Sequence, residues 1–104
     1  MEARIVIDVD AVADVCRRHG ILRLALFGSV LTDAFGPESD VDVLVEFRAG
    51  SEPGFFALAR IGDELCELFG RPVDVVTRSS VEGSANYLRR QRILGSARVV
   101  HDAA

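Results

Sequence analysis

The sequence predicts a single α/β domain of the α+β kind, in which helices flank a small mixed sheet of three or four strands. Apolar, β-branched runs at residues 22–27, 41–47 and 71–77 are typical of strands. Segments with helical periodicity separate these runs. A chain of 104 residues that is 49% hydrophobic is long enough for one core but not for two. We therefore expect residues 1–104 to form one domain with the element order α-β-α-β-α-β-α.

The first half of the chain begins with a predicted helix over about residues 10–19. Apolar residues recur on one side of it, and Gly20 is typical of a residue that ends a helix in a left-handed conformation. A strand follows at residues 22–27. A short helix is expected over residues 29–34, and the turn-forming Phe-Gly-Pro at 35–37 ends it.

The second half of the chain alternates in the same way. The longest predicted helix carries an apolar stripe at helical spacing, with acidic residues on its other side. The expected elements, in order, are a strand at 41–47, a loop at 48–54, a helix at 55–69, a strand within 71–77, a helix at 85–94 and an extended segment at 97–101.

The motif richest in chemical information is Gly28-Ser29 followed by Asp40 and Asp42. Gly28 and Ser29 end an apolar strand, where the backbone and a hydroxyl can approach an anion closely. Residues two apart on a strand share a face at about 6.5 to 7 Å, so Asp40 and Asp42 can reach the same cation. Aspartate is rare inside strands, and its presence here calls for a physical reason.

A purely structural interpretation of this pair is also available. Asp40 could finish a turn, and Asp42 could lie on the solvated face of an antiparallel strand. A third carboxylate, Asp74, in another short β-rich run favours the chemical interpretation. If the two strands are neighbours, three acids face one pocket, where Mg²⁺ or Mn²⁺ would neutralise them.

These residues resemble the minimal nucleotidyltransferases of the DNA polymerase beta superfamily, and in particular the MntA-like antitoxin group. That family carries a strand ending in Gly-Ser, an Asp-x-Asp pair about ten residues later, and a third Asp on a later strand. Gly28-Ser29, Asp40, Asp42 and Asp74 match this pattern in order and spacing. The resemblance extends from the helix before Leu24 to the Asp74 strand.

One position departs from the family pattern. The family often has an arginine a few residues after Gly-Ser, where this chain has Val30, Leu31 and Thr32. A triphosphate contact of the family is therefore missing at position 32, and this puts full activity in question.

The resemblance implies a nucleotidyltransferase fold and Mg²⁺-dependent transfer of AMP from ATP. Asp40, Asp42 and Asp74 would be catalytic and would hold two Mg²⁺ ions, with Asp74 as a candidate to take the proton. Gly28 and Ser29 would bind the nucleotide. In the antitoxin group the acceptor is a tyrosine hydroxyl of a HEPN-type toxin, so the expected partners are ATP and such a toxin.

Two other functions remain open from the residues. The chain could be a non-catalytic antitoxin that neutralises its partner by binding alone, which the missing arginine favours. Transfer of a nucleotide to a small molecule would normally need an additional substrate domain.

The arginines of the last predicted helix, Arg89, Arg90 and Arg92, lie near Tyr87. They are interpreted first as a solvated helix face, and second as a contact with a nucleotide, RNA or an acidic partner.

Charge and hydropathy limit the remaining possibilities. The net charge of -4 argues against binding to DNA or RNA through a basic face. No apolar run approaches the roughly 20 residues that a membrane helix needs. The sequence thus predicts a cytoplasmic protein with no membrane association and no direct DNA binding.

Overall fold

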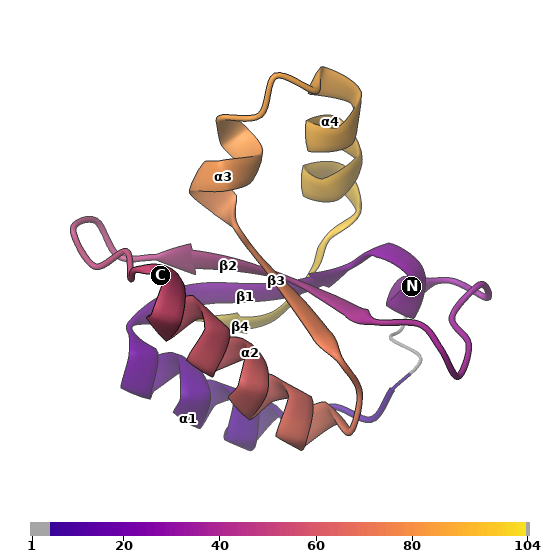
Figure 1. Ribbon diagram of the computed structural model, residues 1–104, viewed down its shortest axis with the longest axis horizontal. Helices are drawn as coiled ribbons and strands as arrows, with labels where there is room; N and C mark the ends of the chain where they lie inside the picture. Colours follow the sequence, from indigo (N-terminus) through magenta and orange to yellow (C-terminus); the bar gives the residue numbers. More distant parts are fainter. Residues whose placement is uncertain (1–4, 104) are drawn as a thin grey trace.

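A computed structural model describes residues 5–103 of the chain. A four-stranded sheet forms the middle layer, with α1 and α2 on one face and α3 and α4 on the other (Figure 1). The elements in chain order are α1 (Val9–His19), β1 (Ile21–Phe27), the one-turn 3₁₀ helix η1 (Gly28–Leu31), β2 (Val41–Phe47), α2 (Phe55–Phe69), β3 (Val73–Thr77), α3 (Arg78–Glu82), α4 (Tyr87–Ser96) and β4 (Arg98–Asp102).

The sheet is mixed, as the sequence predicts, and its strand order is β3-β2-β1-β4. β1 pairs antiparallel with both β2 and β4. β3 pairs parallel with β2, because α2 carries the chain back across the sheet between the two strands. β2 and β3 thus both start at the same end of the sheet.

Local signals explain why the two longer helices begin and end where they do. The side chain of Asp8 accepts a hydrogen bond from the Ala11 amide at 3.1 Å and caps the start of α1. Gly20 and Gly70 end α1 and α2 in the left-handed conformation, with φ of 71° and 68°. α2 matches its predicted bounds of 55–69, and β2 matches 41–47.

The sheet has a separate apolar cluster on each face. The larger one packs α1 and α2 against alternate residues of β1 and β2, with Ile61 and Leu65 fully buried. The smaller one lies under α3 and α4 and consists of Ala25, Phe27, Leu44, Val81 and Ile93. The helical layer that carries α4 is therefore attached to the sheet by few apolar side chains.

Three parts of the chain differ from the predicted elements. The helix expected over 29–34 ends at Leu31, because the Thr32 hydroxyl donates to the Ser29 carbonyl and accepts from the Ala34 amide, which stabilises a turn instead. A short helix, α3, follows β3 directly. The extended segment expected at 97–101 becomes the edge strand β4.

No helix of residues 5–103 is both long enough and apolar enough to span a membrane.

Candidate functional site

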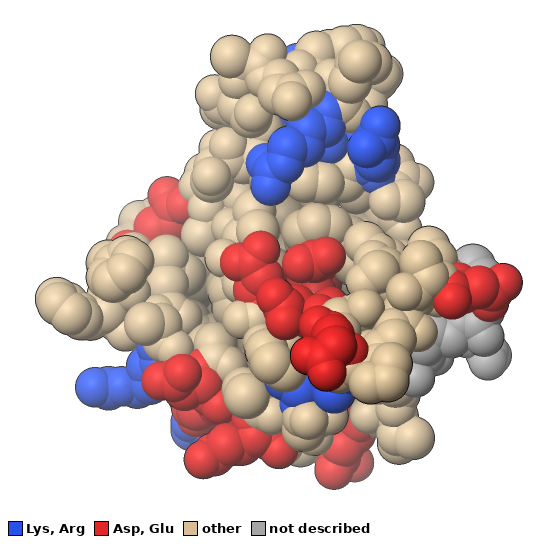
Figure 2. All heavy atoms as spheres, turned by 45° about the vertical axis from the view of Figure 1, so that its right-hand side comes forward, with Lys and Arg blue, Asp and Glu red and all other residues tan. Residues whose placement is uncertain are grey.

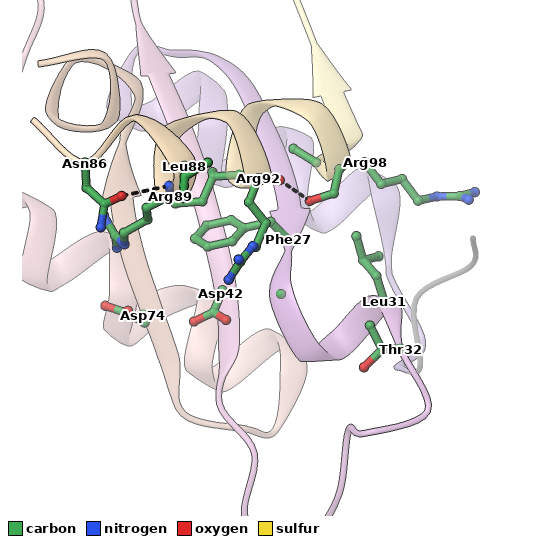
Figure 3. Close-up of a pocket in the computed structure, with 14 residues that line it drawn as sticks. Phe27, Leu31, Thr32, Asp42, Asp74, Asn86, Leu88, Arg89, Arg92 and Arg98 are labelled. Atoms are coloured by element: carbon green, nitrogen blue, oxygen red, sulfur yellow. Dashed lines mark hydrogen bonds between the residues drawn. The ribbon is translucent and has the colours of Figure 1, made fainter. Parts of the chain in front are cut away.

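A pocket of about 1120 Å³ lies between the sheet and α4 (Figure 3). Its sheet-side wall comes from η1, β2 and β3, which contribute Gly28, Asp42 and Asp74 respectively. α4 contributes the opposite wall. The pocket is thus formed by residues from both ends of the sequence.

Asp42 and Asp74 are brought together by strand register. They are direct partners in the parallel pairing of β2 with β3. Because side chains alternate along a strand, both point to the face that α4 covers, while their neighbours Val41 and Val73 pack toward α1 and α2. The sequence predicts that the acids face one pocket if the two strands are neighbours; β2 and β3 are neighbours, and Asp42 and Asp74 line one pocket.

Gly28 makes room for the Asp42 carboxylate. Its φ of 78° lies in the left-handed region, which residues other than glycine rarely adopt. A Cβ on this residue would lie 3.2 Å from the Asp42 carboxyl carbon and closer still to one of its oxygens. The turn after β1 therefore contacts the acid directly, which only glycine allows.

The electrostatics of Asp42 reflect this crowding. Its partial burial raises the pKa of the carboxyl above the ordinary value, and the charges of Asp74 and Asp40 raise it further. Arg89 acts in the opposite direction. A cation between the carboxylates would relieve the repulsion, so the site favours a positive ligand.

Asp40 and Ser29 lie beside this pocket rather than in its lining. Asp40 is exposed and directly precedes β2, near enough for its charge to act on Asp42. Ser29 is half-buried in η1, where its carbonyl accepts the Thr32 amide. The structure thus brings Gly28, Asp42 and Asp74 together and leaves these two residues at the margin.

Arg71 holds the loop that leads to Asp40. From its position just before β3, its guanidinium donates to the carbonyls of Gly36 and Ser39, the second at 2.7 Å. It also lies over the Phe35 ring, 4.3 Å from the centroid. The starts of β2 and β3, and with them Asp42 and Asp74, are thereby tied to one loop.

The donor set has the chemistry of a site for a hard cation. Asp42 and Asp74 offer carboxylate oxygens, which Mg²⁺ and Mn²⁺ prefer. Within residues 5–103, no three acidic, histidine or cysteine side chains are grouped closely enough to form a complete metal cage. Mg²⁺ at such sites is usually held by one or two carboxylates together with substrate phosphates, so two carboxylates fit this ion.

From the sequence, the arginines of α4 are interpreted first as a solvated helix face, but two of them line the pocket. Arg89 and Arg92 line it opposite the acids (Figure 3). In the space-filling view, basic side chains of the upper layer face acidic side chains of the sheet (Figure 2). Their spacing with Ile93 is visible in the sequence, but only the packing of Ile93 on the sheet shows that this side of α4 faces the pocket.

Comparisons with known proteins agree with this geometry. The model of the family described as "Nucleotidyltransferase domain" matches residues 10–100. "Putative protein adenylyltransferase MJ0435" of Methanocaldococcus jannaschii is 38% identical over 80 residues, which cover 77% of this chain and 80% of the relative.

Solved structures give the same assignment at the level of fold. A structure described as that of a "putative minimal nucleotidyltransferase" is 37% identical, with a TM-score of 0.64 over 86% of this chain and 85% of the other. A chain in the complex of a tri-AMPylated Shewanella oneidensis HEPN toxin with an MNT antitoxin is 17% identical. Its TM-score is 0.61, over 90% of this chain and 69% of that one. The chain belongs to the nucleotidyltransferase domain family and has the fold of the minimal nucleotidyltransferases.

Proposed function

We propose that this protein transfers AMP from ATP to a tyrosine hydroxyl of a HEPN-type toxin and thereby acts as its antitoxin. The observation that carries the proposal is the register that sets Asp42 beside Asp74 in a pocket whose rim at Gly28 has no side chain. Nucleotidyl transfer needs little covalent help from the protein, so positioned carboxylates and a phosphate-sized space are its main requirements.

The proposed roles follow from where the residues lie. Asp42 and Asp74 would hold Mg²⁺ together with the triphosphate, and Asp40 at the strand start would add negative charge beside them. When bound, Mg²⁺ would neutralise charge on the triphosphate and lower the pKa of the attacking hydroxyl. The Gly28 turn would let backbone amides approach the phosphates, and Ser29 would add its hydroxyl.

The reaction forms one bond and breaks one. The tyrosine oxygen attacks the α-phosphorus, the bond from that phosphorus to the bridging oxygen breaks, and pyrophosphate leaves. The hydroxyl proton needs an acceptor. Asp74 is our candidate, since it is exposed at the pocket and a carboxylate can act as a general base.

A protein acceptor is consistent with the exposed apolar side chains. Phe55 and Phe56 at the start of α2 are 78% and 86% exposed, and Leu88 on α4 is 69% exposed. Phe55 and Phe56 contact each other with ring centroids 5.8 Å apart, and an exposed apolar pair of this kind is typical of sites that bind another protein. Leu88 also lines the pocket, so a partner docked there would lie beside the reacting groups.

The test is transfer to the HEPN-type toxin that the proposal predicts as the partner. The purified partner would be incubated with this protein, ATP and Mg²⁺, and its intact mass compared for wild type, Asp42→Asn and Asp74→Asn. A mass gain of one or more AMP groups is expected only with wild type. Replacing the acceptor tyrosine with phenylalanine should abolish the gain. Equal transfer by the Asp42→Asn variant would refute the assignment of the carboxylates.

A matched control separates charge in the pocket from charge in general. Glu67 is an exposed carboxylate on α2 that lies outside the pocket and away from Phe55, so Glu67→Gln should transfer AMP as wild type does. Asp42→Asn should remain folded and become slightly more stable without metal, because it removes a crowded charge. Screening by solvent keeps this gain to about 0.5 kcal/mol.

The second candidate is an antitoxin that neutralises by binding alone, and Thr32 in place of an arginine favours it. The two functions separate on one measurement. If Asp42→Asn protein suppresses toxicity in cells as well as wild type does while no AMP is found on the toxin, binding is sufficient.

A further inference from the structure

Two arginines of α4 face the pocket because they share a helix face with the residue that anchors α4. Arg89, Arg92, Ile93 and Ser96 follow the spacing i, i+3, i+4, i+7 and all line the pocket. Ile93 is buried against the sheet in the smaller apolar cluster. Its packing therefore sets the rotation of the helix and directs both guanidinium groups over the acids.

Neither guanidinium is used by the fold. Among residues 5–103, no hydrogen bond or ion pair of the Arg89 or Arg92 side chain occurs. Arg90, between them, is engaged: it donates to the carbonyls of Ser84 at 3.1 Å and Glu82 at 3.4 Å, and it lies over the Tyr87 ring. The helix thus has one structural arginine and two with all their donors available.

The charges of the pocket are divided between its two walls. Asp42 and Asp74 lie on the sheet side and Arg89 and Arg92 on the α4 side, while Arg98 reaches the pocket from the start of β4 (Figure 3). The two walls face each other across the pocket, and the Arg92 side chain extends toward Asp42 (Figure 3). A ligand that fits this division is anionic toward α4 and carries a cation toward the sheet, and a metal-bound polyphosphate has this form.

Arginine is suited to this contact. Its planar guanidinium offers several donors in a fixed geometry that matches phosphate oxygens, and it stays charged at all relevant pH values. Asn86 caps the start of α4 by accepting the Arg89 amide at 3.0 Å, so the first turn that presents Arg89 is held in place. The wall is therefore preorganised rather than dependent on a loop.

We infer that Arg89 and Arg92 bind the β- and γ-phosphates of the nucleoside triphosphate, and so supply from α4 the contact that Thr32 cannot make at the other side of the pocket. The inference rests on the proposed nucleotidyl transfer and adds to it the residues that distinguish a triphosphate from a monophosphate. Thr32 lines the same pocket, so both positions are within reach of one ligand.

The experiment measures equilibrium dissociation constants for ATP and for AMP, each with Mg²⁺, by calorimetry. Hydrogen bonds to charged groups contribute about 1.5–3 kcal/mol, so Arg89→Ala and Arg92→Ala should each weaken ATP binding by about 10-fold or more. AMP binding should change by less than about threefold. Arg→Lys variants should recover part of the loss, since charge returns without the paired donors.

Two variants serve as controls. Gln91→Ala changes an exposed residue of α4 that does not line the pocket, and Arg60→Ala removes an exposed positive charge from α2. Both should bind ATP as wild type does. Circular dichroism of each variant checks that the helix content and melting temperature are retained.

The outcomes distinguish the inference from the function on which it rests. Wild-type protein that binds no ATP would overturn both. ATP binding that both arginine variants retain would overturn the inference alone, and if transfer to the partner then fell, the basic wall would be a partner contact. Equal losses for ATP and AMP would also overturn it, because the contact would not involve the outer phosphates.

Discussion

Gly28 is the residue at which the backbone of this fold and the chemistry of its pocket meet. A Gly28→Ala substitution combines a left-handed φ of 78° with a Cβ against the Asp42 carboxylate. The strained backbone alone costs about 1–3 kcal/mol, and the displaced carboxylate adds to it. We expect a lower melting temperature and loss of AMP transfer, measured by thermal unfolding and by partner mass.

Gly50 offers a matched control for that substitution. Its φ is 80°, yet nothing lies within 4 Å of where its Cβ would be. Gly50→Ala should therefore show the cost of the backbone conformation without the contact to Asp42, and it should retain transfer. If both variants lost activity to the same degree, the proximity of Gly28 to Asp42 would not be what matters.

At the residue scale, the sequence identifies the aspartates of the pocket better than it identifies the arginines. Asp42 and Asp74 are recognisable because aspartate in a strand interior is unusual and alternation fixes its face. Arg89 and Arg92 sit on a helix whose exposed face is expected to be charged, so their pattern does not separate a pocket from solvent. Only the packing of Ile93 on the sheet shows that these two arginines face the pocket and not bulk solvent.

At the scale of the elements, the conformation of the loop between η1 and β2 depends on Arg71, which lies outside that loop. Arg71→Ala removes two hydrogen bonds from a charged group and a contact with the Phe35 ring. We expect a loss of about 2–3 kcal/mol in the free energy of unfolding, measured by urea titration. Transfer should fall as well, because the segment that ends in Asp40 loses its support.

Lysine at position 71 tests the geometry of this support. Arg71→Lys keeps the charge and can donate from one nitrogen as Arg71 Nη2 does, but it lacks the planar guanidinium that lies over the Phe35 ring, so it should recover only part of the stability. Full recovery by lysine would mean that charge alone accounts for the effect.

α1 and α2 are joined by ion pairs that make a small part of the stability depend on pH. The hydrogen bond from Arg18 lowers the pKa of Glu64, and His19 acts in the same direction. A carboxyl whose pKa is lowered on folding stabilises the fold above its unfolded value near 4.5, and this contribution is lost as the pH falls through the folded pKa.

Comparing Glu64→Gln with wild type measures this contribution. The difference in unfolding free energy should be under about 1 kcal/mol at pH 7 and should shrink toward zero in acid below pH 4.5. Glu67→Gln, an exposed neighbour on the same helix, should change the free energy of unfolding at pH 7 by less than Glu64→Gln does. A difference that grew in acid would contradict the assignment.

The elements that the sequence predicts best are those with long, regular patterns. The bounds of β2 and α2 follow from a β-branched run and from an apolar stripe of four turns. β4 has only five residues and becomes a strand through pairing with β1, where Arg23 bonds Glu46 on one side and Asp102 on the other, at 2.9 and 3.1 Å. Such a long-range pairing leaves no local signal.

For the whole molecule, the unequal apolar clusters imply that the two faces of the sheet open independently. Ile93 anchors α4 in the smaller cluster, and Ile61 is fully buried in the larger one. Ile93→Ala should remove about 2–4 kcal/mol of local stability and expose amides of α3 and α4 to hydrogen exchange, while amides of β1 and β2 stay protected.

Ile61→Ala provides the comparison for this effect. A similar loss of apolar contact in the larger cluster should lower protection throughout the sheet and both layers, because that cluster holds the whole fold. ATP binding should weaken more in Ile93→Ala than in Ile61→Ala under conditions where both are folded. Uniform loss of protection in both variants would show that the layers unfold together.

The pairing of Asp42 with Asp74 also restricts where this chain can gain or lose residues without loss of the site. One residue gained or lost between α2 and Asp74 would leave β3 able to pair but would turn its carboxylate to the face that α2 covers. Residues 48–54, by contrast, join β2 to α2 beyond the site and can lengthen without turning either acid. Insertions are thus tolerable before α2, in residues 48–54. Between α2 and Asp74 the number of residues is fixed, because it decides whether the Asp74 carboxylate faces the pocket.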